Sequence, residues 1–195
     1  ADKQFVIIGS MNAITYKEVF PLIKEDRMWL GNGFKAGNAF FSSPVNNDYA
    51  DGVFNPDTGL VKFRNVVWFT NIDHGRRHQP LPLMTMADNI KFSRHKEIKG
   101  KEYQKYENYD AIEVNRTQNI PLDYDGLMGV PITFLDKYNP DQFNIIMLAN
   151  GNARSNVPSD ILSKVKYLQH SEDRGGVGII DGQRVYARIL IQRKS

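Results

Sequence analysis

The stretch Phe5–Gly31, FVIIGSMNAITYKEVFPLIKEDRMWLG, lies near the start of the chain and sets the expected fold class. Its first four residues form a continuous apolar run rich in β-branched side chains, which is typical of a strand buried on both faces of a parallel sheet. Thr15 and Glu18 have capping-box spacing, which predicts a helix from Thr15 to about Asp26. Met28–Gly31 predicts a second, short strand. Strand, helix and strand in this order predict a parallel crossover unit, and therefore an α/β fold.

The rest of the chain is expected to contain more strand and loop than helix. Leu60–Ile72 predicts one long strand or a bulged pair, and Phe143–Leu148 predicts another buried strand. Ser159–Leu168 carries apolar residues at helical spacing, with its first serine as the cap. Asp181-Gly182 lies between two apolar runs, which predicts a closing hairpin over residues 177–191.

The composition is that of an ordinary globular protein, with 195 residues of which 41% are hydrophobic and 24% are charged. The length fits one domain or a large piece of one. The absence of cysteine excludes a disulfide scaffold, a cysteine nucleophile and a thiolate metal site, and it fits a cytoplasmic location. No apolar run approaches the roughly 20 residues of a membrane helix. Because a strand-like run follows Ala1 within four residues, we expect the chain to start in mid-domain.

The weak net charge of +3 conceals a basic block. Residues 74–105 carry 8 Lys and Arg against 3 Asp and Glu, and they hold three of the four histidines. A basic block is the electrostatic footprint of a polyanion site. A solvated surface loop is the alternative explanation at this point.

The densest group of functional residue types is Asp73–His78, DHGRRH, directly after an apolar strand. Two arginines can grip phosphates or read guanine through paired hydrogen bonds. The two histidines, four residues apart, also raise a metal site with Asp73 as third ligand, but Gly75 and the adjacent arginines argue against it. The candidate DNA-binding residues, which include two further cations of the block, are His74, Arg76, Arg77, His78, Lys91 and Arg94.

Several strings in the chain resemble the EcoRI-type family of adenine-specific DNA methyltransferases. They are NAITYKE at 12–18, MWLG at 28–31, WFTNIDHGRRH at 68–78 and YENYDAIEV at 106–114. The longest is IPLDYDGLMGVPITFLDKYNPDQF at 120–143, and the closing segment from Ile180 to Ile189 is similar too. The strings follow one another in the family's order through most of the chain.

The resemblance implies a bacterial restriction–modification enzyme that moves a methyl group from S-adenosylmethionine to the exocyclic amine of adenine in duplex DNA. It implies a Rossmann-like sheet with DNA-recognition elements, and a target adenine that is flipped out of the duplex because its amine is inaccessible in the stack. It also implies that an Asn-Pro-Pro-aromatic motif binds that adenine.

This sequence contains no Asn-Pro-Pro-aromatic string and no Phe-x-Gly-x-Gly-like cofactor loop. Both precede the strand that Phe5–Gly9 matches in the family, so the resemblance is to the C-terminal part of the enzyme. Catalytic and cofactor-binding residues are therefore not assigned, and no metal is expected. We expect one region over 1–195. It comprises a crossover at 1–31, a strand plus a basic DNA-facing segment at 60–105, and a strand-rich remainder at 106–195.

Three functions stay open at this stage. The chain is either part of the methyltransferase, inactive by itself, or a non-catalytic DNA-binding module related to the enzyme. An unrelated enzyme with a metal on Asp73, His74 and His78 is the third reading. Double-stranded DNA is the expected partner, and a homodimer is possible because an exposed sheet edge invites pairing.

Overall fold

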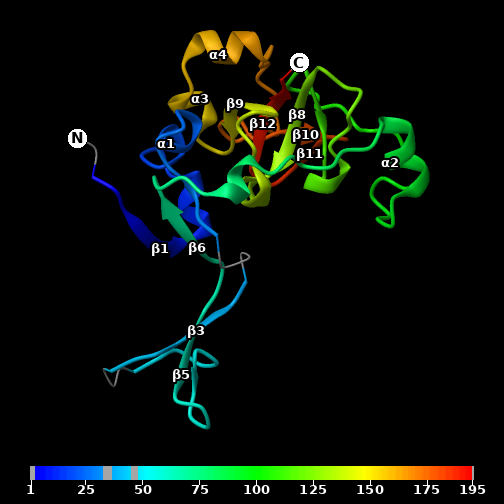
Figure 1. Ribbon diagram of the computed structural model, residues 1–195. Coiled ribbons are helices and arrows are strands. Elements are labelled where there is room, and N and C mark those ends of the chain that lie inside the picture. Colours follow the sequence, from blue (N-terminus) through cyan, green and yellow to red (C-terminus); the bar gives the residue numbers. More distant parts are fainter. Residues whose placement is uncertain (1–2, 33–36, 45–47, 195) are drawn as a thin grey trace.

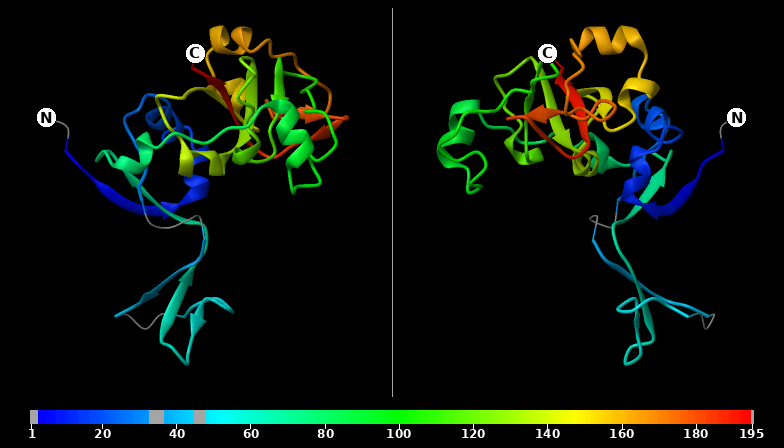
Figure 2. Two further views of the ribbon diagram at one scale, coloured as in Figure 1. Left: turned by 45° about the vertical axis from the view of Figure 1, so that its right-hand side comes forward. Right: turned by 180° about the vertical axis from the view of Figure 1, so that it is seen from behind.

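The computed structural model describes residues 3–32, 37–44 and 48–194, and it has a body from which one small sheet projects (Figure 1). The body contains a four-stranded and a three-stranded sheet together with short helices. The projecting sheet lies away from the body in every view (Figure 2). The fold is therefore mixed α/β with several small sheets, and a Rossmann arrangement is not among the described elements.

The four-stranded sheet is the centre of the body, with strand order β7-β8-β12-β9. Its strands are β7 (Ala111–Glu113), β8 (Leu127–Pro131), β9 (Phe143–Ala149) and β12 (Arg188–Arg193). The last strand, β12, lies between β8 and β9 and is antiparallel to both, whereas β7 and β8 are parallel. The C-terminal strand is therefore a central strand of the sheet, and its two neighbours come from earlier parts of the chain.

Both faces of this sheet are buried, because alternate residues along its strands enter two different cores. Ile189 and Ile191 of β12 belong to one cluster, and Leu190 between them belongs to the other. The first core also takes in side chains of α1 (Phe20–Lys24), and the second takes in Ala153 of α3 (Ala153–Asn156). This two-sided burial explains why Phe143–Leu148 is apolar almost throughout.

A buried ion pair crosses the four-stranded sheet. The guanidinium of Arg188 donates to both carboxylate oxygens of Glu113, and the two side chains are 13% and 3% exposed. The hydroxyl of Tyr106 donates to the same carboxylate. Gly129 of β8 leaves the space for that tyrosine, because a Cβ at this position would collide with its ring.

The three-stranded sheet of the body has the order β1-β6-β2. Its strands are β1 (Val6–Ser10), β2 (Trp29–Leu30) and β6 (Val66–Thr70). Both β1 and β2 are antiparallel to β6, so they run in the same direction with β6 between them. The segment over 1–31 therefore joins two strands of one direction, but these strands do not pair with each other.

The burial predicted for the first apolar run is wrong for this structure. The exposed fractions of Val6, Ile7 and Ile8 are 55%, 53% and 44%. Successive side chains of a strand point to opposite faces, so both faces of β1 are open. The second edge of β1 also pairs with no strand of the described chain.

The projecting sheet, with order β3-β5-β4, consists of β3 (Ala39–Ser42), β4 (Phe54–Asn55) and β5 (Leu60–Phe63). The predicted strand over Leu60–Ile72 is in fact this β5 followed by β6, so the bulged-pair reading is the better one. Asn65, with a φ of 53°, makes the bend between the two strands. The two strands that follow one another in sequence therefore belong to different sheets.

The helices are shorter than the sequence predicts. A 3-10 helix, η1 (Met11–Thr15), follows β1, and Thr15 ends it instead of capping a longer helix. Pro21 lies in the first turn of α1, where a missing N–H costs nothing. α4 covers Ser159–Lys164 only, and Leu168 is 68% exposed. The remaining helices are η2 (Gly75–His78), α2 (Met86–Phe92), η3 (Thr117–Asn119) and η4 (Ile132–Lys137).

The closing hairpin is confirmed at its turn but not in its second arm. β10 (Ile179–Ile180) and β11 (Gln183–Arg184) pair antiparallel around Asp181-Gly182. Both turn residues have positive φ, 50° and 67°, as a two-residue hairpin turn of this kind requires. The apolar run that follows leaves the hairpin and becomes β12 of the four-stranded sheet.

Candidate nucleic-acid interface

The predicted motif Asp73–His78 follows β6, and its last four residues form η2, beside the turn that joins α1 to β2. His74 precedes η2 in an extended conformation, and its Nε2 lies 2.9 Å from the carbonyl oxygen of Leu30. This contact ties the start of η2 to β2. His74 is thereby directed into the body, away from the other histidine of the motif.

Arg77 contacts an acidic side chain of the turn that joins α1 to β2 and an aromatic side chain of β2 itself. Its Nη2 donates to Oδ1 of Asp26 at 2.7 Å, and its guanidinium carbon lies 4.0 Å from the ring centroid of Trp29. Asp73 is a second carboxylate at 3.6 Å. Only 10% of the arginine side chain is exposed. In this structure Arg77 therefore joins η2 to the α1–β2 turn.

Arg76 and His78 are also paired within the chain. Arg76 donates from Nη2 to Oδ2 of Asp136 in η4 at 2.7 Å. His78 lies between Asp73, at 2.9 Å, and Asp141, at 3.4 Å. The hydrogen bond to Asp73 raises the pKa of His78 above its ordinary 6.5, and Asp141 adds to the effect. The same bond lowers the pKa of Asp73.

The other two candidates, Lys91 and Arg94, are exposed and lie on or just after α2, at one edge of the body (Figure 1). Thr85 caps this helix through a hydrogen bond from the backbone N–H of Asp88. Asn89 anchors it, since the side chain is fully buried and donates to the carbonyl of Asn119. The buried Asn89 therefore holds the inner face of α2 against the body, and the cations lie on the exposed side.

Two further exposed cations accompany them, Lys96 and Lys99. We call the four residues Lys91, Arg94, Lys96 and Lys99 the α2 basic surface. Within the described residues, none of the four forms an ion pair. The motif 74–78 and the α2 basic surface thus differ, because the cations of the first form ion pairs inside the described chain and those of the second do not. Lys91 has an aromatic contact instead, with its Nζ 4.9 Å from the ring centroid of Phe92.

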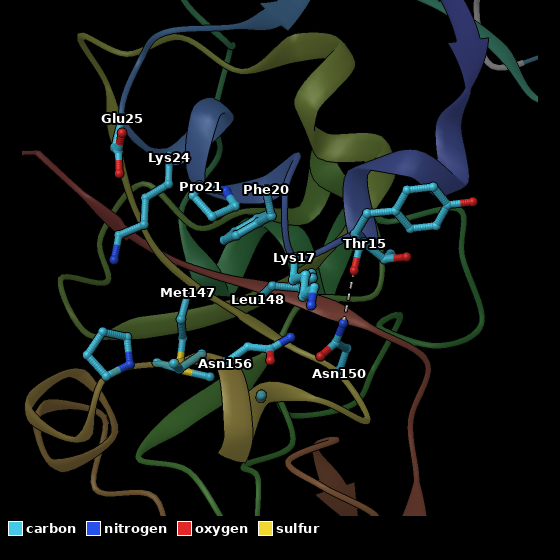
Figure 3. Close-up of a pocket in the computed structure, with 14 residues that line it drawn as sticks. Thr15, Lys17, Phe20, Pro21, Lys24, Glu25, Met147, Leu148, Asn150 and Asn156 are labelled. Atoms are coloured by element: carbon cyan, nitrogen blue, oxygen red, sulfur yellow. Dashed lines mark hydrogen bonds between the residues drawn. The ribbon is translucent and has the colours of Figure 1, made fainter.

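A cavity that the sequence analysis missed lies between α1 and the end of β9 (Figure 3). Its volume is about 410 Å³, and it has mostly apolar walls with two lysines and two asparagines among its lining residues. Its walls come from segments more than 120 residues apart in the chain. No local motif marks such a site. The only signal in the sequence was the pair of lysines, Lys17 and Lys24, in the predicted helix.

The structure separates the residues of the metal reading. His74 contacts Leu30, whereas His78 contacts the two aspartates. Within residues 3–32, 37–44 and 48–194, no three His, Cys, Asp or Glu side chains gather as a metal site would require. Among the same residues, no helix combines the length and apolarity that crossing a membrane needs.

Comparison with known proteins shows that the chain is similar to type II methyltransferases. The chain resembles the type II methyltransferase M.EcoRI of Escherichia coli, with 44% identity over 153 residues, which cover 77% of this chain and 44% of that protein. It also resembles M.MgeORF184P of Mycoplasma genitalium, with 34% identity over 203 residues, and M.MpnI of Mycoplasma pneumoniae, with 33% over 202 residues. Those two matches cover 99% and 98% of this chain, and 58% and 57% of the relatives. No solved structure matches the chain.

The family model described as "Adenine-specific methyltransferase EcoRI" matches residues 1–194. The chain therefore belongs to the EcoRI family of adenine-specific methyltransferases. It spans about half the length of the curated relatives that it matches. The resemblance found in the sequence is confirmed.

Proposed function

We propose that this chain is the DNA-contacting part of a site-specific enzyme that transfers a methyl group from S-adenosylmethionine to the exocyclic amine of adenine in duplex DNA. The observation that carries the proposal is the family match over residues 1–194. The α2 basic surface supports it, since four exposed cations without an ion pair among the described residues favour a phosphate backbone. The adenine must leave the stack to react, because its amine is inaccessible inside a duplex.

The methyl donor is assigned to a part of the enzyme outside this chain. The described cavity is a poor fit for S-adenosylmethionine, which has a net positive charge because its sulfonium and amine outweigh its one carboxylate. Two lysines, Lys17 and Lys24, line that cavity against one carboxylate, Glu25, so its lining charge is positive. Like charges oppose binding, so we assign the chain no cofactor contact and no catalytic residue.

The β1-β6-β2 sheet supports a Rossmann-like arrangement in the whole enzyme. Val6, Ile7 and Ile8 have the continuous apolar pattern of a central strand, yet both faces and one edge of β1 are open. We propose that the cofactor-binding part of the methyltransferase polypeptide pairs with this edge and covers these faces. The relatives, about twice as long as the matched segment, have enough additional chain to do so. A second copy of this chain is the competing occupant, and the mass of the particle in solution distinguishes the two.

Salt-dependent binding tests the proposed DNA contact. The affinity for duplex DNA is measured by fluorescence anisotropy between about 50 and 200 mM salt. The logarithm of the affinity is expected to fall linearly with the logarithm of salt. Lys91→Ala with Arg94→Ala should reduce that slope by about two, one for each lost phosphate contact.

Lys164→Ala is the matched control, because Lys164 is also an exposed helical lysine without an ion pair in the described chain. Its slope should equal that of the unchanged chain. Equal slopes for all three proteins would place the α2 basic surface away from DNA. Salt-independent binding, or none, would contradict the proposed function. Binding without methyl transfer after the completing polypeptide is added would leave the chain as a DNA-binding module.

A further inference from the structure

The cavity between α1 and β9 has mostly apolar walls. It lies where the two cores of the body meet, since Phe20 and Leu148 belong to one core and Met147 and Ala153 to the other. Figure 3 shows Phe20 and Pro21 on one side and Met147 and Asn156 across from them. A volume of about 410 Å³ is in the usual range for a small-molecule site.

Three of the polar side chains that line this cavity, Asn156, Lys17 and Lys24, have few partners within the described chain. Asn156 is exposed, and its Oδ1 accepts a hydrogen bond from Ser155 at 3.4 Å, while its amide nitrogen has no partner within the described chain. Lys24 forms no ion pair with a described residue. Lys17 faces only the adjacent Glu18 at 3.6 Å, and a pair in which both side chains are 70% exposed holds its charge weakly.

These groups together describe the chemistry of the ligand. Apolar walls with an aromatic ring suit a flat ring, and an amide suits a hydrogen-bonding ring edge. Two lysines against the one lining carboxylate, Glu25, leave a net positive charge that suits a phosphate. A peptide side chain would use the walls but not the lysines. S-adenosylmethionine would use the walls but would be repelled by the lysines.

We propose that this cavity binds one unstacked nucleotide of the DNA. The inference rests on the proposed function, because it takes duplex DNA as the ligand of the chain. The base lies between Phe20 and Met147, Asn156 hydrogen-bonds its edge, and Lys17 and Lys24 receive the flanking phosphates. The family's adenine-binding motif, Asn-Pro-Pro-aromatic, does not occur in this sequence. We place in the cavity a nucleotide other than the methylated adenine, because the resemblance assigns that adenine to the Asn-Pro-Pro-aromatic motif.

A mononucleotide titration tests the cavity without requiring duplex binding. Deoxyadenosine 5′-monophosphate is added to the ¹⁵N-labelled 195-residue chain, and the backbone amide signals are followed by NMR. Signals from residues 15–25 and 147–157 are expected to move together, and those of α2 to stay. Asn156→Trp places a large ring at the mouth of the cavity and should abolish the shifts.

Ser155→Trp is the matched control, because Ser155 is an exposed residue of the same helix that does not line the cavity. This variant should retain the shifts, and urea unfolding of both variants verifies that each is folded. The proposal is overturned if the nucleotide moves no signal from the cavity. It is also overturned if S-adenosylhomocysteine moves the same signals at lower concentration, since the cavity would then be a cofactor site.

Two duplexes separate this inference from the proposed function. A duplex with one unpaired adenine should bind roughly tenfold more tightly than the fully paired duplex, as expected for stacking of one base. Asn156→Trp should remove that ratio and leave affinity for the paired duplex unchanged. Equal affinity for both duplexes refutes the cavity inference alone. Failure to bind either duplex refutes the proposed function, and the mononucleotide titration then decides the cavity.

Discussion

Replacing Arg77 by alanine distinguishes a residue that reads DNA from one that holds the fold. Its guanidinium lies 4.0 Å from the ring centroid of Trp29, and at 10% exposure this cation–π contact is worth about 1–2 kcal/mol. The bond to Asp26 adds up to about 1 kcal/mol, because that carboxylate is 47% exposed and stays solvated. The packed stem adds about 1 kcal/mol. Arg77→Ala should therefore lower the free energy of unfolding by about 3 kcal/mol.

Urea unfolding measures this loss as a lower midpoint with an unchanged slope. Arg94→Ala is the control, since the side chain is exposed and unpaired in the described chain, and its unfolding free energy should change by less than about 0.5 kcal/mol. Arg77→Lys keeps the charge but loses the planar group over Trp29, and should recover only part of the stability. The reasoning is refuted if Arg77→Ala leaves stability unchanged while duplex affinity falls about tenfold.

Three further predictions concern the body. Glu113→Ala leaves Arg188 buried without its partner and should cost about 3–5 kcal/mol of unfolding free energy, measured by urea unfolding. Gly129→Ala places a methyl group against the ring of Tyr106 and should cost about 1–3 kcal/mol in the same measurement. The pKa of His78 is raised in the folded state, so its contribution is complete below its ordinary 6.5 and disappears as pH rises through the raised value. Unfolding free energy should therefore fall with pH above 6.5, and His78→Gln should flatten that fall.

Each of these predictions has a contrary outcome. Equal costs for Glu113→Ala and for the double change with Arg188→Met would show that no buried charge had been stranded. A stable Gly129→Ala variant would mean that Tyr106 moves aside freely. A pH dependence that survives in His78→Gln would assign the effect to another group.

Some elements could be predicted locally. The turn at Asp181-Gly182 and the strand at Phe143–Ala149 depend on turn chemistry and on a continuous apolar run, both of which are readable along the chain. The position of the second hairpin arm was not predictable, because the apolar sequence of β12 suits a hairpin arm and a central strand equally well. Its partners, β8 and β9, decide the matter from about 40–60 residues away.

The helix predicted from Thr15 shows the same limit. The capping-box spacing is present, but the hydroxyl of Thr15 donates to the carbonyl of Asn12 within η1 and caps no following helix. The helix α1 begins only at Phe20. The candidate site behaves likewise. The basic block was visible as composition, but composition does not tell a paired arginine from a free one. Asp26 and Asp136, which pair with Arg77 and Arg76, lie about 50 and 60 residues away in the chain.

The sequence by itself determined the family, the basic character of residues 74–105 and the buried strand Phe143–Ala149, because these follow from residue type, order and local periodicity. Only the tertiary structure decided where the charges are used. It pairs the cations of η2 with acids from other segments, leaves those of the α2 basic surface without an ion pair among the described residues, and forms a cavity from α1 and β9. The physical reason is that ion pairs and cavities depend on distances across space, whereas a sequence gives only distances along the chain.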